Sequence, residues 1–84
     1  MAIFPIYGYF VGDHIPHLVA VDTDDTMAQV AEKVAAHSVG RRVRPRAAGN
    51  GFEALIGGRL IAETVVLGSL GLRPLDWVDV RYRE

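Results

Sequence analysis

The sequence predicts an α+β fold, in which a mixed β-sheet packs on one main helix. Two features predict it: a pair of extended segments precedes a single amphipathic segment, and all further extended segments follow that one. A lone helix with one apolar stripe covers one face of a sheet, which gives a two-layer structure. At 84 residues, 50% of them hydrophobic, the chain is expected to form one domain spanning residues 1–84.

The first two strands are expected at residues 3–11 and 17–21, joined by the turn residues Gly12 and Asp13. Alternation assigns the side chains of the first strand to two opposite faces: Phe4, Ile6, Gly8 and Phe10 on one, and Ile3, Pro5, Tyr7, Tyr9 and Val11 on the other. The second strand alternates in the same way, so the two segments are expected to form a β-hairpin.

A helix is expected to begin at Thr26, because Thr26 and Gln29 match a capping box. One side of this helix carries five residues at helical spacing: Met27, Val30, Ala31, Val34 and Ser38. Gly40 is expected to end it, since glycine readily adopts the left-handed conformation found just after a helix.

The remaining elements are three strands and one helical turn: strands at residues 52–56, 59–61 and 77–82, and the turn within residues 67–72. The glycine pair Gly57-Gly58 separates the first two of these strands. With the first and last strands of the chain parallel in the middle of the sheet, this order of elements is the β-grasp topology of ubiquitin-like domains.

Composition narrows the possible functions. Nine basic against ten acidic side chains give a net charge of −1, which supplies no overall attraction to nucleic acid or an anionic membrane. The absence of cysteine excludes disulfides, thiolate metal sites and a cysteine nucleophile. No apolar run reaches the length of a membrane span and no secretion signal is recognised, so a cytoplasmic location is expected.

The pattern predicts no catalytic, cofactor-binding or metal-binding residue in this chain. His14 and His17 have a spacing that some metal sites use, but no thiolate accompanies them, and both are expected to be solvent-facing loop residues. His37, late in the helix, is expected to interact with the helix C-terminus rather than to act as a general base. Three acids are expected to close the second strand and to favour the positive end of the helix dipole: Asp22, Asp24 and Asp25.

The most prominent charged feature is a group of four arginines stiffened by one proline: Arg41, Arg42, Arg44, Pro45 and Arg46. Arginine suits bidentate pairing with carboxylates at interfaces, so this segment is the candidate subunit interface. A solvated loop and a nucleic-acid contact are the alternatives, and the second lacks a neighbouring aromatic stacking platform. Trp77 is interpreted as a core residue, with a partly exposed anchor as the alternative.

The chain resembles the gamma (B) subunits of toluene and related aromatic or alkene monooxygenases. The resemblance covers most of the chain and rests on these residues: Phe4-Pro5, Val19 to Asp22, Met27, Gln29 to Ala35, His37, Arg41 to Val43, Pro45-Arg46, Gly71-Leu72, Pro74 and Val78 to Val80. Residues 47–66 depart from the toluene pattern, since this chain has the apolar, glycine-rich stretch Phe52 to Gly58 there. An alkene or isoprene monooxygenase is therefore as admissible as a toluene one.

The resemblance implies a non-catalytic subunit of a hydroxylase with two copies each of alpha, beta and gamma chains. The implied diiron centre belongs to the alpha chain, and the implied system also contains an effector protein, a Rieske-type ferredoxin and a flavin reductase. Its reaction would be hydroxylation or epoxidation driven by NADH and O2. The alternative is a free-standing ubiquitin-like adaptor; the internal position of Gly57-Gly58 argues against a modifier or sulfur carrier, which presents Gly-Gly at its C-terminus.

Overall fold

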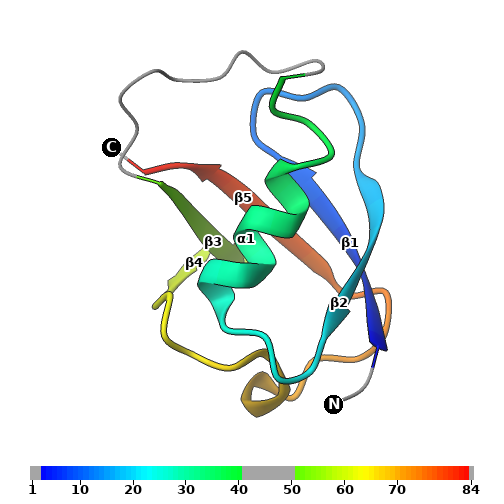
Figure 1. The fold of residues 1–84 in the computed structure, drawn as a ribbon, viewed down its shortest axis with the longest axis vertical. Coiled ribbons are helices and arrows are strands. Elements are labelled where there is room, and N and C mark those ends of the chain that lie inside the picture. Colours follow the sequence, from blue (N-terminus) through cyan, green and yellow to red (C-terminus); the bar gives the residue numbers. More distant parts are fainter. Residues whose placement is uncertain (1–2, 41–50, 84) are drawn as a thin grey trace.

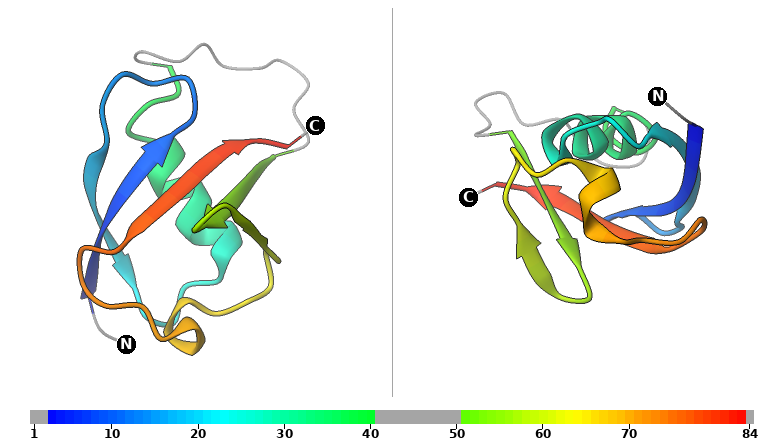
Figure 2. Two further views of the ribbon diagram at one scale, coloured as in Figure 1. Left: turned by 180° about the vertical axis from the view of Figure 1, so that it is seen from behind. Right: turned by 90° about the horizontal axis from the view of Figure 1, so that it is seen from below.

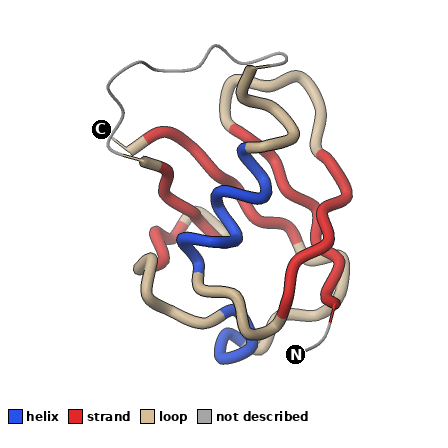
Figure 3. The backbone as a smooth tube through the Cα atoms, in the orientation of Figure 1, coloured by secondary structure: helices blue, strands red, loops and turns tan. Residues whose placement is uncertain are grey.

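The computed structural model describes residues 3–40 and 51–83 (Figures 1 and 3). Its elements in chain order are β1 (Ile3–Phe10), β2 (His17–Asp22), α1 (Met27–Ala35), β3 (Phe52–Ile56), β4 (Arg59–Ile61), the 3₁₀ helix η1 (Leu67–Leu70) and β5 (Trp77–Tyr82). This is the predicted order. The bounds of β3, β4 and β5 are those predicted, and η1 is the expected helical turn.

The five strands form one sheet in the order β2-β1-β5-β3-β4. Strands β1 and β5 pair in parallel at the centre, while β2 on β1, β3 on β5 and β4 on β3 are antiparallel. Helix α1 crosses one face of this sheet, and among the described residues no helix covers the opposite face (Figure 2). The predicted β-grasp topology is therefore confirmed.

The predicted faces of β1 are also confirmed. Ile6 and Phe10 are fully buried beneath the helix, whereas Ile3 and Tyr7 on the other face are 82% and 41% exposed. The strand ends one residue earlier than expected, because Val11 leaves the ladder and forms an isolated bridge with Asp13. Each strand thus contributes one face to the core and one to the outer surface.

Helix α1 begins as predicted, with the Thr26 hydroxyl accepting from the Gln29 backbone and the Gln29 side chain accepting from the Thr26 backbone. It ends earlier than predicted, at Ala35 instead of near Gly40. After α1 the backbone continues with hydrogen bonds of the 3₁₀ type, because the backbone N–H groups of His37 and Ser38 donate to carbonyls three residues back. Gly40 does adopt the left-handed conformation, with φ +82°, but outside the regular helix.

The core lies between α1 and the sheet. It consists of one contiguous set of buried apolar side chains: Ile6, Phe10, Val19, Val21, Met27, Val30, Ala31, Val34, Ala35, Ala54, Leu67, Val78 and Val80. Strands β3 and β4 are joined by a tight turn, in which Gly57 and Gly58 both have positive φ. Such a two-residue turn matches the twist of antiparallel strands, so the glycine pair is a hairpin turn, as expected.

Candidate functional site

The interface predicted from the sequence, Arg41, Arg42, Arg44, Pro45 and Arg46, lies outside the described residues. Its role therefore stays a prediction. Within residues 3–40 and 51–83, two groups of side chains depart from the usual pattern of an apolar core and a polar surface. One is a buried polar cluster where the β1–β2 loop meets the end of α1, and the other is an aromatic group on the helix-free face of the sheet.

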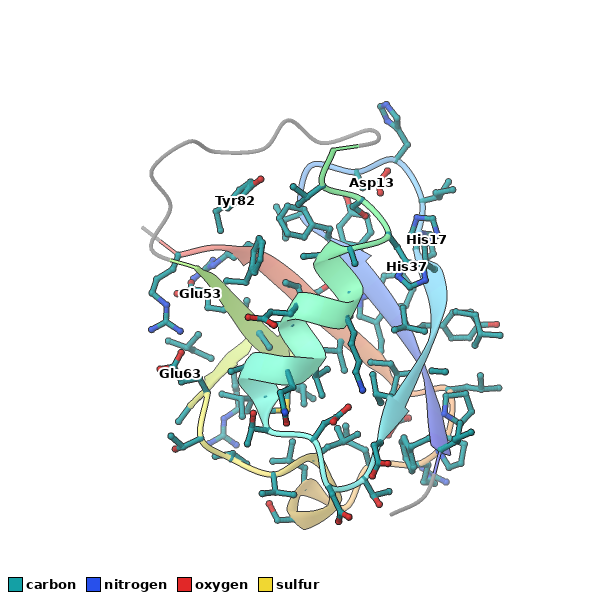
Figure 4. All side chains as sticks on the ribbon, viewed as in Figure 1. Asp13, His17, His37, Glu53, Glu63 and Tyr82 are labelled. Atoms are coloured by element: carbon teal, nitrogen blue, oxygen red, sulfur yellow. The ribbon has the colours of Figure 1, made fainter. Side chains whose placement is uncertain are left out.

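The polar cluster is centred on Asp13, whose side chain is fully buried (Figure 4). Its carboxylate accepts a hydrogen bond from the Ser38 hydroxyl, which is itself 0% exposed, and another from the His14 backbone N–H. The Tyr9 hydroxyl donates to the Asp13 carbonyl oxygen at 2.9 Å. Since Asp13 and Ser38 are 25 residues apart, these bonds tie the β1–β2 loop to the end of α1.

His17 and His37 lie beside this carboxylate (Figure 4). The Nε2 atom of His17 is 3.5 Å from the Asp13 carboxylate, and the two imidazole rings are 5.4 Å apart between centroids. His37 Nδ1 is 3.0 Å from the Lys33 carbonyl oxygen, which can only accept, so the predicted contact of His37 with the helix C-terminus is confirmed. His17 is the first residue of β2, as the predicted strand bounds had it. Its side chain packs largely buried at this junction, so the expectation that it faces solvent from a loop is wrong.

The order of contacts in this cluster argues against catalysis. A nucleophilic serine needs a base that accepts its proton, with the carboxylate behind that base. Here the Ser38 hydroxyl donates directly to the Asp13 carboxylate, and Ser38 is fully buried. No pocket lies among residues 3–40 and 51–83 to admit a substrate. We therefore assign the cluster a structural role, holding a loop against the helix.

Metal binding is not supported by the described part of the chain either. There, no group of three or more histidine, aspartate or glutamate side chains is placed to hold a metal ion. His14 is exposed while His17 turns toward Asp13, so the His14-to-His17 spacing does not produce a common site. The described residues thus do not fit a diiron centre, which the resemblance assigns to the alpha chain.

The acids before α1 close the turn, as predicted. The Asp25 carboxylate accepts from the Asp22 backbone N–H at 2.9 Å, and the Asp22 carboxylate accepts from the Asp24 backbone N–H at 2.8 Å. Asp25 also forms an ion pair with Lys33 of α1. These bonds link the end of β2 to the start of the helix, which is a structural arrangement rather than an acid–base pair.

The interpretation of Trp77 as a core residue is wrong. Trp77 is 47% exposed and lies on the sheet face opposite the helix, with its ring centroid 6.5 Å from that of Tyr7 and 6.0 Å from that of Tyr9. Its alternation with Val78 and Val80, both 0% exposed, could have predicted this orientation. The partial exposure agrees with the alternative interpretation of Trp77, whose role as an interface anchor stays a prediction.

The Asp13–Ser38 bond gives a direct test of the cluster's structural role. Replacing Asp13 by alanine is expected to lower the free energy of unfolding by about 1–3 kcal/mol, because the buried Ser38 hydroxyl loses its acceptor. Urea denaturation of Asp13→Ala, Ser38→Ala and the double variant measures the coupling between the two side chains. Strictly additive single effects would contradict a shared bond.

The fold defines a class of protein: a small ubiquitin-like domain, in whose described residues no pocket and no metal-binding group is found. Comparison with known proteins identifies the family. Residues 3–82 match the family of toluene-4-monooxygenase system protein B, and the chain belongs to that family. No helix in the described part of the chain is both long and apolar enough to cross a membrane.

Relatives and solved structures agree with this assignment. The chain is 48% identical to the gamma subunit of the oxygenase component of the alkene monooxygenase system of Xanthobacter autotrophicus, with all of both chains covered. It is 38% identical, again over all of both chains, to the gamma subunit of the hydroxylase component of toluene-4-monooxygenase from Ectopseudomonas mendocina. These relatives are hydroxylase or oxygenase subunits, as the resemblance implied.

Among solved structures, a chain from a toluene 4-monooxygenase HD complex with the inhibitor 4-bromobenzoate superposes with a TM-score of 0.89 at 37% identity, covering 98% of this chain and 100% of the other. A ubiquitin from Caldiarchaeum subterraneum gives a TM-score of 0.72 at 24% identity, covering 99% of this chain and 96% of that one. The second match confirms the ubiquitin-like fold alone.

Proposed function

We propose that this protein is the non-catalytic gamma subunit of a soluble diiron monooxygenase hydroxylase, and that it binds and stabilises the large alpha subunit. The observation that carries the proposal is the end-to-end match to two gamma subunits, of an alkene and of a toluene system. Because those matches cover each relative completely, the single domain accounts for the whole of both named subunits. The lack of a pocket in its described residues is consistent with a role in assembly.

The proposed assembly contains two copies each of alpha, beta and gamma chains in the cytoplasm, with the diiron centre in alpha. An effector protein, a Rieske-type ferredoxin and a reductase complete the proposed system, which would hydroxylate aromatic substrates or epoxidise alkenes. The higher identity to the alkene relative, 48% against 38%, favours an alkene substrate. The gamma subunit would affect this reaction only by holding the hydroxylase together.

Co-expression with the alpha and beta subunits of the same host tests the proposal. We expect the three chains to elute together in gel filtration at equal stoichiometry, and the hydroxylase to lose stability when the gamma chain is omitted. Elution of this chain apart from the others would contradict the proposal. Capture of a different protein from the host, with no hydroxylase subunit present, would instead support a free-standing adaptor.

The segment comprising Arg41, Arg42, Arg44, Pro45 and Arg46 is proposed to contribute charged contacts to this assembly. Reversing Arg42 and Arg44 to glutamate is expected to weaken complex formation, because bidentate arginine–carboxylate pairs would become repulsive. The matched control reverses Arg59 and Arg73, which lie on the described part of the chain and change the net charge by the same amount. Equal assembly of both double variants would place the interface elsewhere.

A further inference from the structure

The helix-free face of the sheet carries large side chains from three adjacent strands. Register pairs Tyr7 of β1 with Leu18 of β2 on one side and with Trp77 of β5 on the other. These three residues are 41%, 60% and 47% exposed, although Tyr7 and Trp77 belong to the two central strands. By this register the three residues are neighbours in one row across β2, β1 and β5. The row lies on the side of the sheet that α1 does not cover, and Figure 2 shows the position of α1 relative to the sheet.

The aromatic side chains in this row are held in place before any partner arrives. Trp77 packs between the rings of Tyr7 and Tyr9, and its indole N–H donates to the Asp79 carboxylate at 2.7 Å. The Tyr9 hydroxyl is bound to the Asp13 carbonyl oxygen. Rings whose orientation is already fixed lose little side-chain entropy when they are covered, which favours their use as interface anchors.

Two further exposed apolar residues lie on the same face, outside this row. Ile3 is 82% exposed at the start of β1, and Leu60 is 60% exposed on β4, where it pairs with Leu55. Together with Leu18, Tyr7 and Trp77 they present apolar surface on the order of 500 Å², at roughly 150–250 Å² for a whole aromatic side chain and somewhat less for an aliphatic one. A standard interface buries about 800 Å² on each partner, of which about 65% is apolar in its core. The face therefore supplies the apolar area that one side of a standard interface requires.

Three charged side chains of β3 and β5 on this face have an ion-pair or hydrogen-bond partner there. Arg81 is paired with Glu53 across β5 and β3, and Asp79 accepts the Trp77 indole. The solvent side of α1 is different in kind, because polar side chains such as Glu32 and Lys33 are exposed there. Of the two broad faces, the sheet face is therefore the one that matches an apolar surface of a partner protein. Among the described residues it has no excess of basic side chains to attract nucleic acid or an anionic membrane.

We propose that this sheet face, defined by Ile3, Tyr7, Leu18, Leu60 and Trp77, is the surface on which the large alpha subunit of the hydroxylase packs. The inference rests on the proposed function and adds to it which face of the domain contacts the alpha subunit. The matches to the two gamma relatives run through all of both chains, so the strands that form this face lie within the matched region. The alpha subunit would contribute aliphatic and aromatic side chains of matching area.

Two substitutions test this face in the co-expressed complex. Leu18→Glu adds a charge at an exposed position of the edge strand β2, and Trp77→Ala removes the central ring. Each is expected to raise the Kd of the gamma chain for the rest of the hydroxylase by at least about 30-fold, which is the effect of losing an interface hot spot. The matched control is Ile15→Glu, which makes the same kind of change at a residue 48% exposed in the β1–β2 loop, outside the five residues that define this face.

Hydroxyl-radical footprinting of the wild-type complex supplies a measurement that does not depend on variants. Tyr7, Leu18 and Trp77 are expected to be labelled in the isolated chain and protected in the hydroxylase. Protection of these residues, with dissociation of both variants but not of the control, supports the proposal. Equal labelling in both states overturns it.

The remaining outcomes separate this inference from the proposed function. If wild-type protein assembles and both face variants assemble equally well, the sheet face is wrong while the gamma-subunit function stands. If wild-type protein does not join the hydroxylase, both the proposed function and the proposal that the alpha subunit covers this face are contradicted. If sedimentation finds a dimer of the isolated chain that Trp77→Ala abolishes and the hydroxylase leaves these residues labelled, the occupant is a second copy, which also overturns the proposal.

Discussion

Replacing Phe10 by alanine is expected to lower the free energy of unfolding by about 3–5 kcal/mol. Phe10 is fully buried, and its ring makes edge-on contacts with Phe52 at 5.8 Å and with Tyr82 at 5.2 Å between centroids. It thereby joins β1 to β3 and β5, three strands whose pairing defines the centre of the sheet. Removing the ring leaves a cavity that these stiff neighbours cannot fill.

The consequence for a domain of this size is severe. Small domains have a total stability of about 5–15 kcal/mol, so a loss of this magnitude removes much of it. Guanidinium denaturation followed by circular dichroism measures the change, with Phe10→Leu as the control that retains most of the volume and is expected to cost less than Phe10→Ala. A change below about 1 kcal/mol for Phe10→Ala would show that this ring does not hold the three strands together.

Gly8→Ala is expected to destabilise the protein by about 1–3 kcal/mol, although alanine is locally the better strand residue. A Cβ atom at position 8 would lie 2.6 Å from one Val34 methyl carbon, 3.0 Å from the other, and 3.2 Å from a methyl carbon of Val19. Val34 is buried on α1 and is branched at Cβ, so it cannot rotate away easily. The glycine therefore permits the close approach of helix and sheet.

The sign of the stability change distinguishes two effects of placing alanine at position 8: better strand propensity and closer packing against Val34. Local propensity predicts that alanine stabilises a strand by about 0.5–1 kcal/mol, whereas packing predicts a loss. Urea denaturation of Gly8→Ala, Val34→Ala and the double variant resolves them, because removing the Val34 methyl groups should make the alanine at position 8 less costly. A stabilising Gly8→Ala would mean that α1 adjusts its position over the sheet without penalty.

These two variants also provide a reference for the assembly experiments. Phe10→Ala and Gly8→Ala act on the core and should reduce complex formation only in proportion to the loss of folded protein. Leu18→Glu changes a side chain that is 60% exposed, and is expected to reduce complex formation while circular dichroism of the isolated chain stays unchanged. Comparing both groups of variants separates loss of folding from loss of an interface.

The order of the elements and the faces of β1, β2 and α1 were predictable from sequence because they depend on local patterns. Alternation placed Ile6 and Phe10 inside, and the capping pair Thr26 and Gln29 marked the start of the helix. The bounds of β3 and β4 agreed with the turn at Gly57-Gly58. Each of these features is determined by side chains a few residues apart, which is the range over which sequence patterns are informative.

Other features depend on residues that only the folded chain brings together. The early end of α1 accompanies the bond from Ser38 to Asp13, 25 residues away, and His17 is drawn into the same junction. Trp77 is a different case, because its alternation with the buried Val78 already indicates the outer face, and the prediction of a core residue overlooked that local signal. The local sequence thus determined a ubiquitin-like domain with a concentrated arginine segment. Only the tertiary structure decided which face of the sheet stays uncovered, because long-range strand pairing and the position of one helix control burial.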